Sequence, residues 1–179
     1  LTIPHIDIAA PTSKEELEKI LDFSLDIEKP LAIRIPKETP YNYEFSGYEY
    51  GKWNKVRDGK KYMIIACGAM FSEVMKIEKE LGELLDAAIV SAAWIRPFDI
   101  EFIKKEFPKY EKVIILEDGI EKSGFGTEIL EYVNDLNIST KIIRKGISHK
   151  FLPHAKRPEL LEDEKLIGKS LLDDIVAKV

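Results

Sequence analysis

The stretch VIILEDGIEKSGFGTEILEYV, residues 113–133, decides the fold that we expect. It opens with an apolar, β-branched run that is too short for a helix and is typical of a strand buried on both faces of a parallel sheet. Two carboxylates, Glu117 and Asp118, stand where that strand ends. A loop with Gly124 and Gly126 follows, and the apolar spacing after it predicts an amphipathic helix. Ligands and partners gather at the carboxyl ends of strands in open α/β sheets, so we look for function at this corner first.

The size and composition of the chain exclude several classes of protein. Its 179 residues are enough for one α/β domain, or for one domain plus part of another. A net charge of -5 without a dominant basic patch argues against a nucleic-acid partner. No apolar run approaches the roughly 20 residues that span a membrane, so we expect no membrane contact. The single cysteine, Cys67, fits a reducing compartment, and we expect the cytoplasm.

The first 35 residues predict one β-α-β unit. Strands are expected near residues 6–10 and 31–35, and the capping-box spacing of Ser13 and Glu16 predicts the start of the helix between them. So small a unit cannot cover its own sheet. It either joins the sheet that follows or is the end of a sheet that is missing, and the chain, which opens on Leu1 rather than Met, is expected to be a fragment or a processed product. We expect residues 1–45 to pack on a partner or to be poorly ordered.

Beyond an aromatic passage at residues 39–53, strands and helices alternate. We place a domain boundary in that passage, which resembles a linker lying on a surface because it is not rich in Gly and Ser. The alternation that follows predicts an α/β fold with a mostly parallel, doubly wound sheet. The expected strands are residues 62–66, 87–93, 113–116 and 141–144, and the expected helices are residues 70–81, 99–107, 127–133 and 169–178, with a looser segment around His149 and His154.

The glycines and carboxylates of the opening stretch each have two interpretations. Gly124 and Gly126 lack the third glycine of a dinucleotide fingerprint, so a tight entry into the helix is favoured over a phosphate cradle. Glu117 and Asp118 have the chemistry for a metal site or for acid–base catalysis, but no further ligand has suitable spacing. The favoured role is structural: they accept hydrogen bonds from loop N–H groups, or pair with a basic residue such as Arg96 or Lys122.

Three other groups of residues also have a functional and a structural interpretation. Arg34 and Lys37 flank a proline at the end of the second predicted strand, where two cations either grip a phosphate ester or form a solvated edge. His149 and His154 do not have a metal-ligand spacing. Cys67 follows a buried strand with no histidine near it in sequence, which favours an inert core thiol over a nucleophile.

A series of short motifs runs in a recognisable order through almost the whole chain. The motifs are Ile3-Pro4 with Ala10–Ser13, Pro30–Lys37, Gly51-Lys52, Ile65–Gly68, Arg96–Asp99, Glu117-Asp118 with Ser123–Thr127, and Phe151–His154. Their order resembles the C-terminal third of the 1-deoxy-D-xylulose-5-phosphate synthases, thiamin diphosphate enzymes of the transketolase superfamily. The chain departs from the family pattern at Ile35, Glu38 and Ala155, where the family has Tyr, Gly and Gly.

The resemblance implies a division of the chain. Residues 1–45 would be the tail of the pyrimidine-binding domain plus a linker, and residues 46–179 the C-terminal domain, whose mostly parallel sheet has an antiparallel edge strand. The full-length enzyme would be a homodimeric transferase that uses thiamin diphosphate and Mg²⁺ in isoprenoid and thiamine biosynthesis. The motifs that hold both groups lie upstream in the family, so we expect this chain alone to bind neither and to be inactive.

The resemblance also implies roles for six residues. Lys37 aligns with the basic residue that helps to hold the phosphate of glyceraldehyde 3-phosphate, and Arg34 is a second candidate for that role. Glu117, Asp118, Gly124 and Gly126 would form a corner that faces the neighbouring domain or subunit. An alternative is a non-catalytic assembly half of a split transketolase, or of a 2-oxo acid dehydrogenase β-like subunit.

Overall fold

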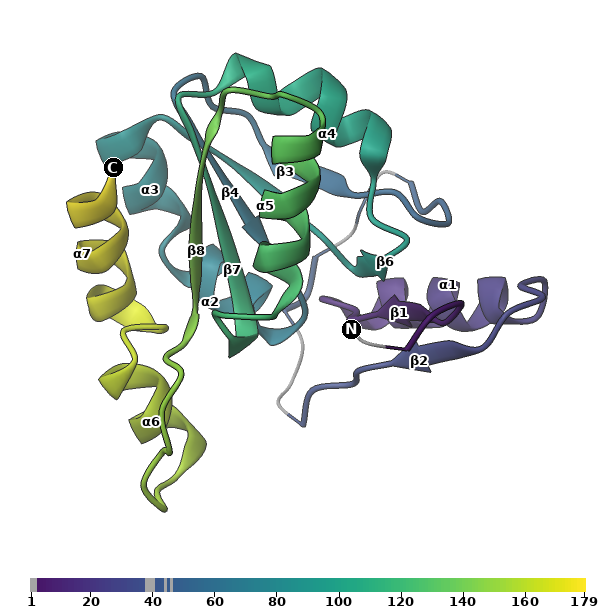
Figure 1. The fold of residues 1–179 in the computed structure, drawn as a ribbon. Helices are drawn as coiled ribbons and strands as arrows, with labels where there is room; N and C mark the ends of the chain where they lie inside the picture. The colour runs from purple at the N-terminus through teal and green to yellow at the C-terminus, as the bar shows by residue number, and fades with distance from the viewer. Residues whose placement is uncertain (1–2, 38–40, 44, 46) are drawn as a thin grey trace.

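The larger of two sheets has five strands in the order β3-β5-β4-β7-β8 (Figure 1). The computed structural model describes residues 3–37, 41–43, 45 and 47–179. Strands β4, β5, β7 and β8 run parallel, and β3 pairs with β5 in the antiparallel direction. The mostly parallel sheet is confirmed, and β3 is an antiparallel edge strand. The bounds are β3 (Asn54–Arg57), β4 (Tyr62–Ala66), β5 (Ala87–Ser91), β7 (Lys112–Ile120) and β8 (Lys141–Ile147).

Helices cover both faces of this sheet. Successive residues of β4 show why its sequence is continuously apolar: Ile64 packs into one core cluster, Ile65 packs into the other, and both are fully buried. One face carries α2 (Ala69–Lys76), α3 (Glu78–Leu85), α6 (Arg157–Asp163) and α7 (Gly168–Lys178), and the other carries α4 (Ile100–Glu106) and α5 (Phe125–Asp135).

No helix among the described residues is long and apolar enough to cross a membrane.

Two helical predictions were wrong in detail. The apolar stripe over residues 70–81 predicted one helix, but the backbone of Ile77 leaves the helical region at φ -117°, ψ 16°, and α2 and α3 are separate helices. The predicted loose segment contains α6, whose Pro158 lies in the first turn. A proline is tolerated there because the first helical N–H groups have no partner within the helix.

The N-terminal unit forms a second, three-stranded sheet with β6 (Trp94–Arg96). Strands β1 (Asp7–Ala9) and β2 (Leu31–Ile33) are parallel and are connected by α1 (Lys14–Ser24), as the β-α-β pattern predicts. The strands expected from the sequence did not include residues 94–96, which pair antiparallel with β1. The unit therefore joins the rest of the chain through a small sheet of its own. Its origin in a pyrimidine-binding domain, and its packing on a partner, stay predictions.

The start of α1 differs from a standard capping box. Ser13 is the N-cap, and its hydroxyl accepts the Glu16 N–H as predicted. The Glu16 carboxylate does not return to Ser13 but accepts both the N–H and the hydroxyl of Thr12, each at 2.8 Å. The Thr12 hydroxyl lies 3.0 Å from that of Ser91, so this buried polar group connects α1 with β5.

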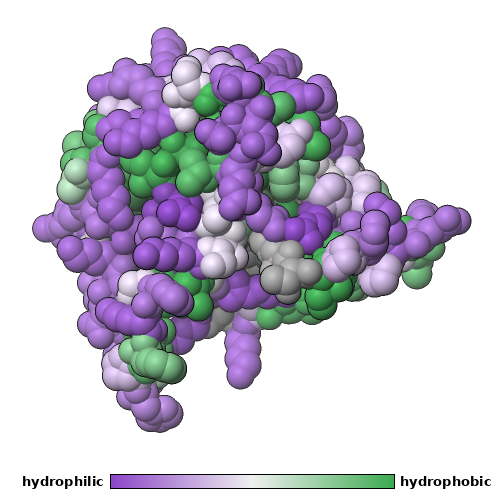
Figure 2. Space-filling view, in the orientation of Figure 1, coloured by the Kyte–Doolittle hydropathy of each residue, from purple (hydrophilic) through white to green (hydrophobic). Residues whose placement is uncertain are grey.

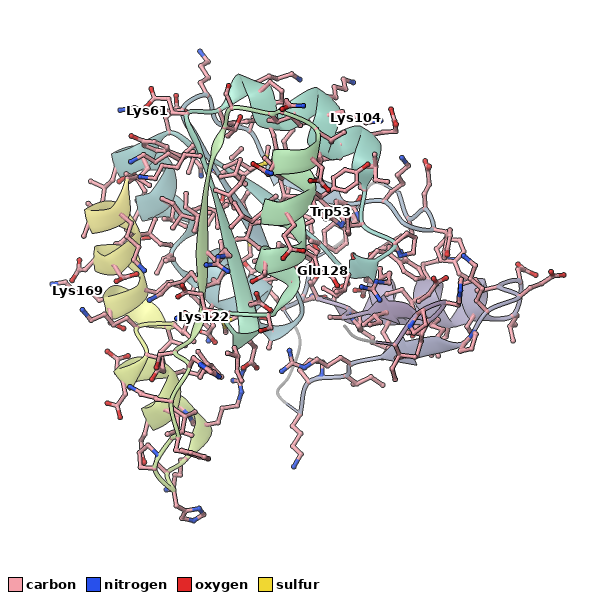
Figure 3. The ribbon with its side chains drawn as sticks, viewed as in Figure 1. Trp53, Lys61, Lys104, Lys122, Glu128 and Lys169 are labelled. Atoms are coloured by element: carbon pink, nitrogen blue, oxygen red, sulfur yellow. The ribbon has the colours of Figure 1, made fainter. Side chains whose placement is uncertain are left out.

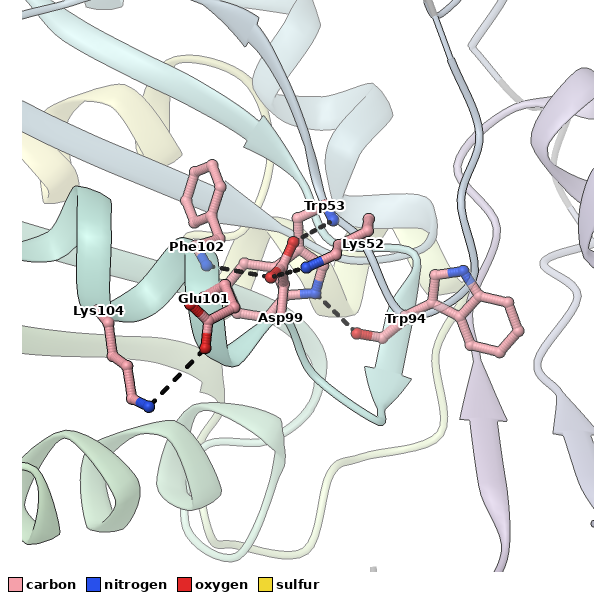
Figure 4. Close-up of polar contacts among 7 residues, drawn as sticks. All are labelled: Lys52, Trp53, Trp94, Asp99, Glu101, Phe102 and Lys104. Atoms are coloured by element: carbon pink, nitrogen blue, oxygen red, sulfur yellow. Dashed lines mark hydrogen bonds and ion pairs between the residues drawn. The ribbon is translucent and has the colours of Figure 1, made fainter.

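The passage that connects the two sheets is held in place by contacts at both of its described ends. Figure 4 shows Asp99 accepting hydrogen bonds from the Lys52 ammonium and the Trp53 N–H, while the Trp53 ring donates to the Trp94 carbonyl. Trp53 is 5% exposed and lies beside α5, as Figure 3 shows. The rings of Tyr41 and Tyr43 pack edge-on against Phe71 of α2. The position of the domain boundary within this passage stays a prediction.

Candidate functional site

The candidate site lies at the carboxyl ends of β4 and β7, where the direction of the connections reverses. The neighbouring strands β4 and β7 lead into α2 and α5, which cover opposite faces of the sheet. A ligand crevice is expected at such a switch point in an open α/β sheet. The N-terminal unit closes over this edge, since the Gly68 N–H after β4 donates to the Ala10 carbonyl at 3.2 Å.

Glu117 organises the entry into α5. Its two carboxylate oxygens accept the N–H groups of Phe125 and Gly126, at 2.9 and 3.0 Å. Those N–H groups belong to the first turn of α5, where a carboxylate also complements the helix dipole. Glu117 is 6% exposed, and its burial raises its pKa, which outweighs the opposing effect of the two N–H bonds. The expectation that loop N–H groups bind this carboxylate is confirmed.

Asp118 has a different environment and faces two arginines. Its Oδ2 atom lies 2.6 Å from Nη2 of Arg157 and 3.6 Å from Nη2 of Arg34. Arg96, which the sequence suggested as a partner for this carboxylate pair, instead forms an ion pair with Glu128 of α5. That suggestion was wrong because β6 carries Arg96 to the second sheet, where it also bonds the Ile3 carbonyl.

A cavity of about 200 Å³ lies beside Asp118. It brings together two groups of candidates that are far apart in the sequence, the turn after β2 and the end of β7. Its lining holds three cationic side chains and one carboxylate, so positive charge is in excess. The lining residues are Arg34, Ile35, Pro36, Lys37, Gly68, Ala69, Asp118 and Arg157.

A second cavity, of about 230 Å³, shares part of this lining. Its own charged residues, Glu73 and Lys76, pair with each other at 2.7 Å. Its remaining lining is uncharged, apart from Arg157, which borders both cavities, and it includes the apolar Pro36 and Ala69. The residues common to both are Pro36, Gly68, Ala69 and Arg157, and the uncharged polar ones of the second are Thr12, Tyr41, Asn42 and Ser72.

Arg157 is the site residue that the sequence did not single out. It comes from a segment expected to be loose, and only the fold of α6 carries it to Asp118. The one local signal was the Arg-Pro pair, since a proline in the first turn marks a helix start.

Cys67 lies buried under the same edge. The residue is 5% exposed, and burial, followed by the nearby Glu117 charge, raises its pKa to about 12. Because a thiolate is the reactive form of cysteine, this environment favours the inert core thiol that the sequence suggested over a nucleophile.

The described residues do not fit a metal or a metal-bound cofactor. They contain no group of three or more His, Cys, Asp or Glu side chains that is placed to hold a metal ion. His149 and His154 are both exposed in the segment between β8 and α6. We therefore derive no step through thiamin diphosphate or Mg²⁺ at this site, and the expectation that the chain alone binds neither stays a prediction.

Comparison with known proteins identifies the family. Residues 51–169 match the family model described as transketolase, C-terminal domain. The chain belongs to the transketolase C-terminal domain family. The resemblance drawn from short motifs is thereby confirmed, and so is the α/β fold class, whereas the assignment of the first β-α-β unit to a pyrimidine-binding domain stays a prediction.

Relatives in sequence include 1-deoxy-D-xylulose-5-phosphate synthases. The protein from Fusobacterium nucleatum is 33% identical over 98% of this chain and 30% of its own length. The protein from Clostridium tetani is 33% identical over 97% and 29%, and that from Thermotoga petrophila is 31% identical over 99% and 30%. The chain thus spans about 30% of the length of these relatives.

Two solved structures share the fold of this transketolase-type chain. One is described as "split gene transketolase, inactive beta4 tetramer", with a TM-score of 0.87 and 22% identity over 99% of this chain and 58% of that one. The other is transketolase from Campylobacter jejuni, with a TM-score of 0.75 and 17% identity over 97% of this chain and 26% of that one.

Proposed function

We propose that this chain is the C-terminal portion of a 1-deoxy-D-xylulose-5-phosphate synthase. The whole enzyme would use thiamin diphosphate and Mg²⁺ to condense pyruvate with glyceraldehyde 3-phosphate, with loss of carbon dioxide. The observation that supports this most is that synthases of this name match the chain over 97–98% of its length at 33% identity. The cofactor, when bound to the upstream domains, would supply the carbon–carbon bond chemistry.

The contribution of this chain to the reaction would be to bind the substrate phosphate. Arg34 and Lys37 line the positive cavity at the switch point, and their side chains are at the surface, where a ligand can reach them. Lys37 would supply a point charge, whereas Arg34 would offer the forked donors that suit a phosphate. Both would hold and orient the phosphorylated aldehyde and neutralise its charge.

The corner at the start of α5 would contact the neighbouring domain or the second subunit of a homodimer. Glu117, Gly124 and Gly126 would act by fixing the shape of this corner, because the Glu117 side chain is buried against the two glycines. Asp118 and the exposed Ile120 would present the contact surface. Hydrophobic surface (green in Figure 2) also lies at the lower right, where Figure 1 places α1 and β2.

The second candidate is a non-catalytic assembly half of a split transketolase-type enzyme. It is favoured by the structural match that covers 99% of this chain and 58% of a split-gene chain. A reading frame that continues upstream of Leu1 through the cofactor motifs supports the first candidate, and a stop codon directly upstream supports the second.

An activity assay tests the proposal. The purified chain is incubated with pyruvate, glyceraldehyde 3-phosphate, thiamin diphosphate and Mg²⁺, and the product is followed by mass spectrometry. We expect no product without the upstream domains. Turnover by the chain alone would contradict the proposal that the upstream domains are needed for catalysis.

A further inference from the structure

Arg157 borders both cavities at the switch point, and these adjoining cavities, which share four lining residues, are called the groove below. We propose that Arg157 is a third phosphate-binding residue, and that the groove takes a short hydroxylated phosphate ester with its phosphate beside Arg34 and Lys37. This inference rests on the proposed function and adds to it a residue on α6, a helix that neither the motifs nor the resemblance assigned to ligand binding.

The charges at one end of the groove match a phosphate monoester. The cavity beside Asp118 is lined by three cations, Arg34, Lys37 and Arg157, and by one carboxylate, which leaves two positive charges in excess. A phosphate monoester carries a charge of about -1.5 to -2 at neutral pH and offers three acceptor oxygens. The start of α2, which also lines this cavity, has no acidic residue in its first turn, so its helix dipole adds to the attraction for an anion.

Asp118 draws the two arginines together. Its Oδ2 atom is 2.6 Å from Arg157 and 3.6 Å from Arg34, so one carboxylate oxygen lies between two guanidinium groups. A phosphate oxygen can accept hydrogen bonds from the same guanidinium groups. The carboxylate therefore holds the two arginines side by side, and it also competes with a ligand phosphate for them.

The other end of the groove suits hydroxyl groups rather than a second charge. Glu73 and Lys76 compensate each other there at 2.7 Å. The hydroxyl of Ser72 and the amide of Asn42 line this end and both donate and accept hydrogen bonds, whereas the Thr12 hydroxyl already donates to Glu16. A ligand that spans the groove thus carries phosphate at one end and hydroxyls at the other, which is the chemistry of a small sugar or polyol phosphate.

A titration with matched variants tests the inference. The 179-residue chain, labelled with ¹⁵N, is titrated with glycerol 3-phosphate, inorganic phosphate and glycerol, and the amide signals of Gly68 and Ala69 are followed. We expect glycerol 3-phosphate to bind more tightly than inorganic phosphate, and glycerol to cause no shift. Arg157→Gln is expected to weaken glycerol 3-phosphate binding about tenfold or more, and Arg157→Lys to give an intermediate value because it keeps the charge but loses the fork.

The control is Lys61→Gln. Lys61 lies just before β4, at the end of the sheet opposite the loop that carries Lys122 in Figure 3. This variant loses the same charge without touching the groove, so its affinity should not change. Melting curves show whether each variant is folded. If Arg157→Gln is not folded, the affinity of Arg157→Lys decides whether Arg157 binds the phosphate.

The outcomes separate this inference from the function on which it rests. If Lys37→Gln weakens binding but Arg157→Gln and Arg157→Lys do not, Arg157 is not a ligand and the proposed phosphate role of Lys37 stands. If none of the three variants changes the affinity, both proposals about phosphate fail. Inorganic phosphate that binds as tightly as glycerol 3-phosphate would overturn the assignment of an ester.

Discussion

A Cβ atom added at Gly124 would stand 2.1 Å from Oε2 of Glu117. The carboxylate fills the place of a side chain at Gly124 so that it can reach the N–H groups of Phe125 and Gly126. The glycine is needed for this close approach and not for a special backbone angle, since its φ of -91° is open to any residue. The motif that resembled an incomplete phosphate cradle is thus a cradle for the chain's own carboxylate.

Gly124→Ala is therefore expected to destabilise the chain by about 1–3 kcal/mol, because the methyl group must displace Glu117 from its buried N–H donors. Urea unfolding measures the change in the free energy of unfolding. Gly47→Ala is the matched control, since a Cβ at Gly47 would have no atom within 4 Å, and it should change stability by less than about 0.5 kcal/mol. Equal stability of the two variants would refute this account of the corner.

The lowered pKa of Glu164 predicts that the folded chain loses stability in acid. Burial opposes its ionisation, but hydrogen bonds from Lys150 and Ser148 prevail and lower its pKa from 4.5 to about 2. A carboxyl group whose pKa is lower in the folded state stabilises that state above its unfolded pKa, and the contribution is lost as the pH falls through the folded value. The stability that Glu164 provides should thus be complete at pH 7 and fade between pH 4.5 and 2.

Glu164→Gln tests this pH dependence. The variant should be less stable than the wild-type chain at pH 7 by about 1–3 kcal/mol, and the difference should shrink steadily below pH 4.5. Glu162→Gln, on the exposed side of α6, is the control and should cost less than about 0.5 kcal/mol. A difference that stays constant from pH 7 to pH 3 would show that Glu164 is not held in its ionised form.

Asp118→Asn is expected to tighten the binding of glycerol 3-phosphate several-fold at low salt. The substitution removes the carboxylate that competes with the ligand for Arg34 and Arg157, and it removes one negative charge from the cavity. The gain should shrink as ionic strength rises, because salt screens the exposed charges. The same titration measures it, with Asp163→Asn on the exposed side of α6 as the control. Weaker binding by Asp118→Asn would contradict this prediction. It would show that Asp118 helps ligand binding more by aligning Arg34 and Arg157 than it hinders binding by competing for them.

Cys67 is expected to resist thiol reagents in the folded chain. Its burial and its pKa of about 12 leave almost no accessible thiolate at pH 7.5. Ellman's reagent should therefore label the chain only as fast as it unfolds, and labelling should become rapid in urea. Prompt labelling of the native chain would contradict the packing beneath the switch point.

The sequence predicted the features that depend on local residue patterns and missed those that depend on contacts between residues far apart in the chain. Strand β4 was placed at its observed bounds because burial on both faces leaves an unbroken apolar run. Strand β6 was not found, because its three residues become a strand only through pairing with β1. Local pattern likewise placed Arg34 and Asp118 in separate candidate groups, and only the fold brings them to one cavity. Arg157 was missed for the same reason, since its partner lies 39 residues away.

A chimeric enzyme tests the central claim most directly. In the synthase of Fusobacterium nucleatum, the segment that matches this chain is replaced by the chain itself, and product formation from pyruvate and glyceraldehyde 3-phosphate is measured. We predict that the chimera is active, that Lys37→Ala raises its KM for glyceraldehyde 3-phosphate about tenfold or more, and that Lys61→Ala does not. A folded chimera without activity would contradict the proposed function. So would a KM for glyceraldehyde 3-phosphate that Lys37→Ala raises no more than Lys61→Ala does.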